Sequence, residues 1–262
     1  MLSVRAVKYL KYILFSRHRK GFGIHSPFVF DLVSRVFRNK TDPGIVLLVE
    51  NIRKRQISDK TRIEVLDLGS GSLALKGSLK RVCDITKYSA VPPAYGKLLY
   101  RMAQEFGGPG IVEFGTSTGI STMYLAAASP DAQVITLEGC PALSALAARN
   151  FSSIGLANIV QIKGDFDDSL RELRKRSVQP GLVFIDGNHR REATVRYFRE
   201  MADMSGDETV IIVDDIHLSA EMEEAWKEIL NSGNVSVSID IFRMGMVFFR
   251  KGMSRFDYVI RY

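Results

Sequence analysis

The sequence predicts an α/β protein with a seven-stranded, mostly parallel sheet, an antiparallel C-terminal hairpin and a helical N-terminal extension. Between residues 110 and 213, short apolar runs alternate with helical segments, as in parallel sheets covered by helices on both faces. Two strand-like runs, VSVSIDIF and GMVFFRK, follow with a short turn between them, which indicates an antiparallel pair. Residues 1–84 are basic and mainly helical in pattern.

The N-terminal extension begins with a predicted amphipathic helix within residues 1–20, where apolar residues recur at near-helical spacing between Arg and Lys. Two functions of this helix stay open: peripheral contact with an anionic membrane surface, or docking on the main domain. Ser26 before Pro27 predicts the start of a second helix, and a third is expected over residues 43–58.

Composition and charge limit the function classes. No apolar run approaches the ~20 residues that a membrane-spanning helix needs. Cys83 and Cys140 form neither a disulfide framework nor a zinc motif, so we expect a reducing, cytoplasmic compartment, with membrane association if residues 1–20 bind lipid. Residues 1–101 carry 20 basic and 7 acidic residues, whereas residues 102–262 carry 16 and 22. A solvated basic face and an anionic partner are both compatible with this asymmetry.

The alternation of apolar runs with helical segments predicts where the central strands and helices lie. The five strands are expected at 110–114, 133–137, 159–162, 182–185 and 210–213, and the helices at 119–128, 141–153, 167–176, 190–203 and 219–231. Parallel strands of this kind place their carboxyl ends at one edge of the sheet, where ligands bind in open α/β folds.

Two glycine-rich stretches compete as the nucleotide-binding turn, VLDLGSGS at 65–72 and IVEFGTSTGIS at 111–121. Such a turn needs a strand before it, a helix after it and an acid at the end of the next strand. Only the second stretch meets these conditions, because QVITLE ends in Glu138. We therefore assign Gly115–Gly119 as the working loop, and interpret Gly69–Lys80 as a flexible basic lid or acceptor-side loop.

Acidic and imidazole side chains also follow the fourth and fifth predicted strands. LVFIDGNH places Asp186 and His189 after one strand, and IIVDDIH places Asp214 and Asp215 after the next. Because carboxyl ends of parallel strands share an edge, we expect these side chains on the edge that carries the glycine loop.

These motifs resemble the class I S-adenosylmethionine-dependent methyltransferases, which have a Rossmann-like fold, and most closely the catechol and caffeoyl-CoA type O-methyltransferases. VEFGTSTGIS is similar to their first motif, Glu138 to their ribose-binding acid, and GDF to the segment that borders adenine. The resemblance covers about residues 85–262, and it implies S-adenosylmethionine as the cofactor. The residues that it implies for cofactor binding are Glu113, Gly115, Thr116, Ser117, Gly119, Ser121, Glu138, Gly139, Asp165, Phe166 and Asp186.

The same resemblance implies a catalytic site. Asp186, Asp214 and Asp215 match the positions that bind a divalent metal in that group, which predicts Mg²⁺ or Ca²⁺. His189 matches the general base, where the group often has Lys. An imidazole, with an ordinary pKa of ~6.5, can accept a hydroxyl proton near neutral pH.

The resemblance predicts O-methylation of a small hydroxylated acceptor. The basic front segment is compatible with an acceptor that is anionic. An RNA methyltransferase that uses the basic front segment is an alternative, although no nucleic-acid-binding module and no Asn/Asp-Pro-Pro-aromatic motif occur. A non-catalytic S-adenosylmethionine-binding or membrane-docking module is another. We expect two functional parts, the extension 1–84, which resembles the front end of uncharacterised bacterial methyltransferases, and the domain 85–262; a homodimer is compatible with both.

Overall fold

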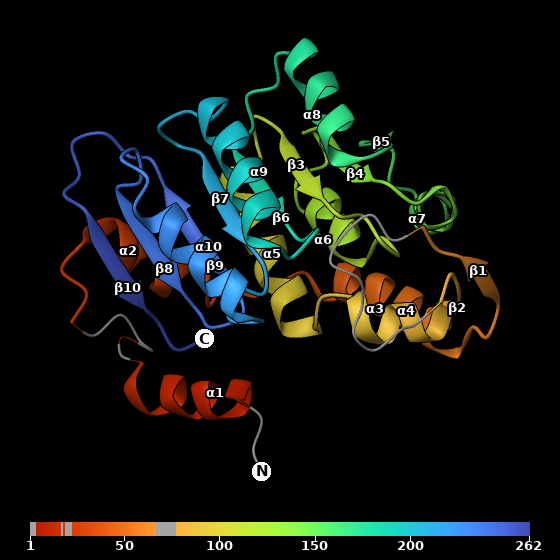
Figure 1. Cartoon of the computed structure of the whole chain (residues 1–262), viewed down its shortest axis with the longest axis horizontal. Coiled ribbons are helices and arrows are strands. Elements are labelled where there is room, and N and C mark those ends of the chain that lie inside the picture. Colours follow the sequence, from red (N-terminus) through yellow and green to blue (C-terminus); the bar gives the residue numbers. More distant parts are fainter. Residues whose placement is uncertain (1–3, 17, 19–22, 67–76) are drawn as a thin grey trace. The chain divides into compact units, whose positions relative to one another are not determined.

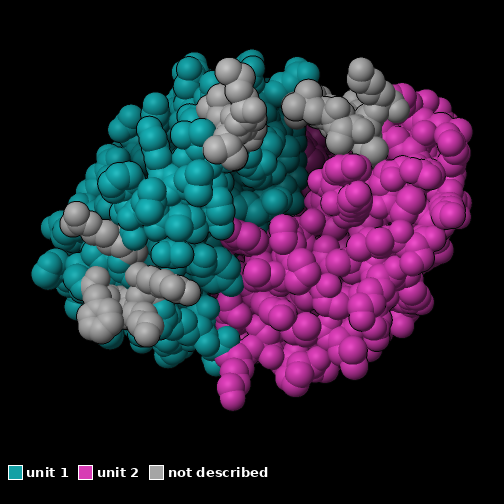
Figure 2. Space-filling model, turned by 90° about the horizontal axis from the view of Figure 1, so that it is seen from below, with its two compact units in different colours: residues 1–39, 183–262 teal, residues 40–182 magenta. Residues whose placement is uncertain are grey.

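The computed structural model describes residues 4–16, 18, 23–66 and 77–262 and divides into two compact units. Unit 1 comprises Met1–Asn39 and Val183–Tyr262, and unit 2 comprises Lys40–Leu182 (Figures 1 and 2). These units reflect compactness, not function, so the expected functional boundary between residues 84 and 85 stays a prediction.

Unit 2 contains the parallel strands β3, β4 and β5 in this order, with helices between them (Figure 1). Ile111 is in register with Val134, and Val134 with Ile159. All residues of β3 and β4 are buried, as expected for apolar runs covered on both faces. The elements are α3 (Pro43–Ser58), β1 (Arg62–Glu64), β2 (Leu79–Arg81), α4 (Val82–Ser89), α5 (Pro93–Phe106), β3 (Ile111–Phe114), α6 (Ile120–Ala128), β4 (Val134–Glu138), α7 (Pro141–Ser153), β5 (Ile159–Lys163) and α8 (Phe166–Lys175).

The first glycine-rich stretch follows a strand of a different kind. β1 pairs antiparallel with β2 in a separate two-stranded sheet, so it is not a parallel strand feeding a nucleotide-binding turn. This agrees with rejecting VLDLGSGS as the working loop. Residues 67–76, with Gly69 and Gly71, lie outside the described residues, and their interpretation as a lid stays a prediction.

Unit 1 contains five strands in the order β10, β8, β9, β7, β6, the last of which begins at Leu182. The predicted hairpin is confirmed, since β8 and β9 pair antiparallel, and β9 also pairs antiparallel with β7. The elements are α1 (Val4–Phe15), α2 (Pro27–Asp31), η1 (Leu32–Val36), β6 (Leu182–Ile185), α9 (Arg191–Asp203), β7 (Val210–Val213), α10 (Ala220–Leu230), β8 (Val237–Asp240), β9 (Gly245–Phe248) and β10 (Phe256–Val259).

Among the described residues, strand β10 raises the number of strands in the larger sheet from the predicted seven to eight. It pairs parallel with β8, with Phe256 in register with Val237. Its residues FDYV are mostly exposed and include Asp257, so the segment lacks the apolar run that marks a central strand. An edge strand of this kind is defined by backbone pairing more than by side-chain burial.

Two helices begin where the sequence predicts, and a side-chain cap is present at each start. The Ser26 hydroxyl accepts a hydrogen bond from the Val29 amide, and Pro27 is the first residue of α2. α3 begins at Pro43 as predicted, where the Asp42 carboxylate accepts hydrogen bonds from the next free amides.

Helix α1 packs against other elements of unit 1. Docking of this kind is one of the two alternatives that the sequence left open. The buried Tyr12 hydroxyl donates to the Ile260 carbonyl at 2.7 Å and accepts from the Tyr262 amide at 2.9 Å. Leu14 and Phe15 stay 75% exposed. None of the described helices has the length and apolar character needed to cross a bilayer.

A chain of charged groups joins α1 to the loop after β7. Lys8 Nζ lies 2.6 Å from Glu223 Oε1, which is 3.2 Å from His217 Nδ1, and His217 Nε2 lies 2.8 Å from Asp240 Oδ2. Burial opposes protonation of His217, but Asp240 and Glu223 outweigh this effect and raise its pKa. In its protonated form, the His217 imidazole bridges two carboxylates.

We expect the stability contribution of His217 to depend on pH. Because the pKa of His217 is raised on folding, its contribution is complete below the unfolded-state pKa of ~6.5 and is lost as pH rises through the higher folded-state pKa. In urea unfolding, His217→Gln should therefore lower the free energy of unfolding more at pH 6 than at pH 9. His25→Gln, at an exposed position, is the matched control. An equal loss at both pH values would contradict the charged bridge.

Candidate active site

The loop between β3 and α6 has a backbone shape that depends on its glycines. Gly115, Ser117 and Gly119 all have positive φ, at 99°, 47° and 85°. A Cβ at Gly119 would lie 2.6 Å from the Phe151 ring, so this position excludes larger residues both by conformation and by space. The Gly115 and Thr116 amides donate to the Leu137 carbonyl, which fixes the loop against the end of β4.

Glu138 lies at the carboxyl end of β4 and contacts this loop directly. Its Oε2 accepts a hydrogen bond from the Ser117 amide at 2.7 Å, and its Oε1 accepts one from the Cys140 amide at 2.8 Å. Burial raises the pKa of Glu138, and these backbone donors oppose the shift. The glycine loop and the acid that the sequence paired across 21 residues are therefore adjacent in unit 2.

Glu113 is a fully buried carboxylate in β3. Its Oε2 accepts hydrogen bonds from Thr122 Oγ1 at 2.5 Å and Thr136 Oγ1 at 2.7 Å. Its Oε1 has no hydrogen-bond partner among the described residues. Burial raises the pKa of Glu113 to about 7, although nearby hydroxyl groups oppose the shift. A buried oxygen of this kind is suited to a donor, and most of all a cationic one, supplied by a ligand.

The other predicted loop residues differ in what they offer. The Thr116 hydroxyl is buried and lies 2.6 Å from the Thr136 hydroxyl, so the side chain of Thr116 contributes to the core. Ser121 is in the first turn of α6, and Gly139 is in the bend after β4. The helix start and the bend place backbone amides at the carboxyl edge of these strands.

The predicted adenine-bordering residues follow β5. Asp165 is the N-cap of α8, and its Oδ1 accepts from the Asp168 amide at 2.8 Å. The half-buried Phe166 ring packs edge-to-face on Phe114 with a centroid distance of 5.5 Å. Asp165 therefore has a structural function that is compatible with ligand contact, and Phe166 presents an aromatic surface next to β3.

Two side-chain amides that the sequence did not indicate donate hydrogen bonds to the backbone of the loop. Gln56 Nε2 and Asn150 Nδ2 both donate to the Thr118 carbonyl, at 3.1 and 3.0 Å. Isolated polar residues on α3 and α7 carry no periodic signal. A polar Thr136 within the apolar run VITLE is a stronger indication, because a buried hydroxyl needs a partner.

In unit 1, the segment after β6 brings Asp186 and His189 together. Asp186 Oδ1 lies 3.6 Å from His189 Nε2, and both side chains are mostly buried. Asn188 between them has a left-handed backbone, with φ of 54°. The Asn188 side-chain Nδ2 donates to the Tyr197 hydroxyl at 3.3 Å, and Asn188 Oδ1 is buried without a partner among the described residues. Asn188 is a further polar group at this edge that the sequence analysis did not single out.

The predicted metal ligands Asp214 and Asp215 have arginine partners instead. Asp214 is fully buried and accepts two hydrogen bonds from Arg243, Nε to Oδ1 at 3.0 Å and Nη2 to Oδ2 at 2.6 Å. Asp215 Oδ1 lies 2.8 Å from Arg5 Nη2. Burial raises the pKa of Asp214, and the positive charge of Arg243 opposes this shift.

These contacts weigh against the predicted metal site. Both Asp214 oxygens face a guanidinium group, so Asp186, Asp214 and Asp215 are not free to converge on one cation. In the part of the chain that the structure describes, no group of three or more His, Cys, Asp or Glu side chains is arranged to hold a metal ion. As these side chains are placed, the donor set does not fit Mg²⁺ or Ca²⁺.

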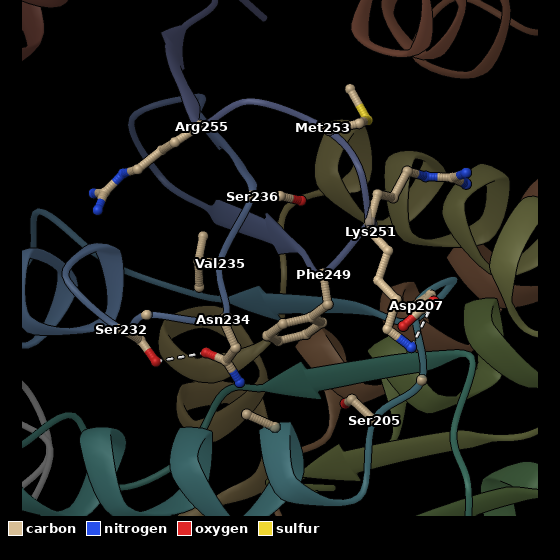
Figure 3. A pocket seen from close by; sticks show the side chains of 14 residues that line it. Ser205, Asp207, Ser232, Asn234, Val235, Ser236, Phe249, Lys251, Met253 and Arg255 are labelled. Carbon is tan, nitrogen blue, oxygen red and sulfur yellow. Dashed lines mark hydrogen bonds and ion pairs between the residues drawn. The ribbon is translucent and has the colours of Figure 1, made fainter.

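A hollow of about 510 Å³ in unit 1 lies at the edge of the sheet opposite to the one that carries Asp186 and Asp214 (Figure 3). Its lining precedes β7 and β8 and follows the antiparallel β9, so it is at the amino ends of β7 and β8. Lys251 Nζ and Asp207 Oδ2 form an ion pair of 3.2 Å there. Because ligands of open α/β sheets bind at carboxyl ends, this hollow is not the candidate active site.

Comparison with known sequences finds a methyltransferase domain that includes the glycine loop. Residues 112–216 match the family described as methyltransferase domain. A catechol O-methyltransferase of Niastella koreensis is 34% identical over 130 residues, which are 48% of this chain and 58% of that protein. One from Mycobacterium tuberculosis is 33% identical over 129 residues, which are 48% and 57%. The match spans just over half the length of these curated relatives.

Comparison with solved structures confirms the fold. An O-methyltransferase from Bacillus cereus in complex with S-adenosylhomocysteine has a TM-score of 0.57 at 20% identity and covers 84% of this chain and 97% of its own. A Podospora anserina methyltransferase bound to the same product has a TM-score of 0.60 at 14% identity, with coverage of 86% and 97%. The predicted resemblance is therefore confirmed: residues 112–216 match a methyltransferase domain, the chain is similar in sequence to curated catechol O-methyltransferases, and its fold is similar to that of solved O-methyltransferases.

Proposed function

We propose that this protein transfers the methyl group of S-adenosylmethionine to a hydroxyl oxygen of a small-molecule acceptor. The observation that carries the proposal is the junction of Glu138 with the glycine loop. Its carboxylate is fixed by the Ser117 and Cys140 amides at the end of β4, where a carboxylate can accept hydrogen bonds from ribose hydroxyls. The relatives, which are O-methyltransferases, support the same chemistry.

Unit 2 supplies the groups for donor binding. The buried Glu113 Oε1, which accepts no hydrogen bond from the described residues, is suited to an ammonium group, such as that of the methionine part of the donor. The amides at the start of α6 are suited to its carboxylate. Phe166, the bend at Gly139 and Asp165 complete the predicted donor contacts of this unit, and the assignment of Asp186 to donor binding stays a prediction.

In unit 1, His189 is the proposed base. S-adenosylmethionine supplies an electrophilic methyl group on a sulfonium sulfur. As the acceptor oxygen bonds to that methyl carbon and the sulfur–carbon bond breaks, His189 accepts the hydroxyl proton. Asp186 Oδ1 lies 3.6 Å from His189 Nε2 and orients the imidazole ring. Alignment of the two reactants contributes the remaining acceleration.

We expect Gly119→Ala to weaken binding of S-adenosylhomocysteine by at least about tenfold in calorimetric titration. The new methyl group collides with Phe151, and the left-handed backbone adds about 1–2 kcal/mol of strain. Gly155→Ala is the control, because Gly155 has a similar φ of 72° with nothing within 4 Å of the added Cβ. Unchanged affinity of Gly119→Ala would show that the loop does not bind the donor.

We expect His189→Ala to lower kcat by about 10²- to 10⁴-fold, which is the usual contribution of a positioned base, while affinity for S-adenosylhomocysteine is retained. The measurement is formation of S-adenosylhomocysteine in a screen of hydroxylated acceptors, including catechols. His25→Ala, at an exposed position, is the matched control. Turnover of His189→Ala at the wild-type rate would contradict its assignment as the base.

A further inference from the structure

Arg243 is the cation to which the fully buried Asp214 is bound. The two hydrogen bonds, at 2.6 and 3.0 Å, join both nitrogen donors to both carboxylate oxygens, in the fork geometry that suits guanidinium and carboxylate. Arg243 Nη2 also lies 3.6 Å from Asp215 Oδ2. One guanidinium group thus faces both carboxylates at the end of β7.

The backbone holds Arg243 in this position. The Arg243 carbonyl accepts a hydrogen bond from the Ile216 amide at 3.2 Å, which joins the β8–β9 turn to the segment after β7. Asp215 and Phe242 have left-handed φ values of 52° and 70°, which non-glycine residues rarely adopt. Strain of this kind persists only where the surrounding contacts fix it, and it is common at functional sites.

A second arginine comes from the N-terminal extension. Arg5 Nη2 on α1 lies 2.8 Å from Asp215 Oδ1, and Lys8 on the same helix binds Glu223. The carboxylates of Asp186, Asp214 and Asp215 and the two guanidinium groups together have a net formal charge of −1. Without the arginines the charge would be −3, which is the condition under which a divalent cation is favoured.

We propose that the Arg243 guanidinium, supported by Arg5, replaces the divalent metal at the carboxyl end of β7, so that the reaction is metal-independent. The catalytic part of this inference rests on the proposed function. Arg243 then offsets the negative charge of the carboxylates at the carboxyl end of β7, where the acceptor oxygen loses its proton. Because Arg5 is on α1, this helix becomes a part of the site.

The first test needs only the wild-type protein. After treatment with EDTA, it is titrated with MgCl₂, CaCl₂ or MnCl₂, and both calorimetric heat and Tm are recorded. We expect no saturable heat and a Tm change below about 1 °C, since RT ln(1 + [L]/Kd) vanishes for a cation that does not bind. A saturable rise in Tm that EDTA reverses, and that Asp214→Asn abolishes, would overturn the proposal.

The second test measures the ion pair. Arg243→Met leaves the Asp214 carboxylate buried without its cation and should lower Tm by roughly 10 °C. The double variant Arg243→Met/Asp214→Asn should recover a part of this loss, because no unpaired charge is left buried. Arg199→Met, which breaks an exposed pair with Glu228, is the control and should change Tm little. Strict additivity in the double variant would contradict the pairing, and the wild-type titration decides the proposal if Arg243→Met does not fold.

Activity separates this inference from the proposed function. Methyl transfer that persists in EDTA supports the inference, and transfer that EDTA stops and Mg²⁺ restores overturns it. If no hydroxylated acceptor is methylated and S-adenosylhomocysteine does not bind, the proposed function fails, while the titration and Tm data still decide whether Arg243 replaces the metal.

Discussion

The hydrogen bond from the Ser117 amide to the Glu138 carboxylate is the contact on which the candidate donor site depends. A buried carboxylate is stable only when it is paired, and the glycine loop supplies the amide that pairs it. The loop can turn toward Glu138 because Gly115, Ser117 and Gly119 adopt left-handed backbone conformations. The conformation of the loop therefore determines both the position of the Glu138 carboxylate and the point at which α6 begins.

The same requirement organises unit 1 with different chemistry. Asp214 is as deeply buried as Glu113, but its partner is the guanidinium of Arg243 instead of hydroxyl groups. The turn that carries Arg243 is fixed to the segment after β7, and α1 adds Arg5 at Asp215. The basic extension thus has a structural partner within its own unit, which accounts for a part of the charge asymmetry along the chain.

Periodicity and turn context predicted most of the fold, because apolar runs and their spacing are local properties. The bounds of α3, β6 and β7 agree with the sequence prediction, whereas the exposed edge strand β10 gave no apolar signal. In the candidate site, the contact between the glycine loop and Glu138 was predictable from spacing, but the partners of Asp214 and Asp215 were not. Arg243 is in a turn and Arg5 is 210 residues from Asp215, and no local pattern reports such long-range pairs.

The central claim, that the loop at Gly115–Gly119 and Glu138 bind the methyl donor, is tested most directly by calorimetric titration with S-adenosylhomocysteine. We predict one site in the wild-type protein and at least about tenfold weaker binding in Glu138→Gln, because the charged acceptor of two hydrogen bonds is lost. Glu105→Gln, at an exposed position of α5, should bind like the wild type. No binding to the wild type, or equal affinity of Glu138→Gln, would contradict the claim.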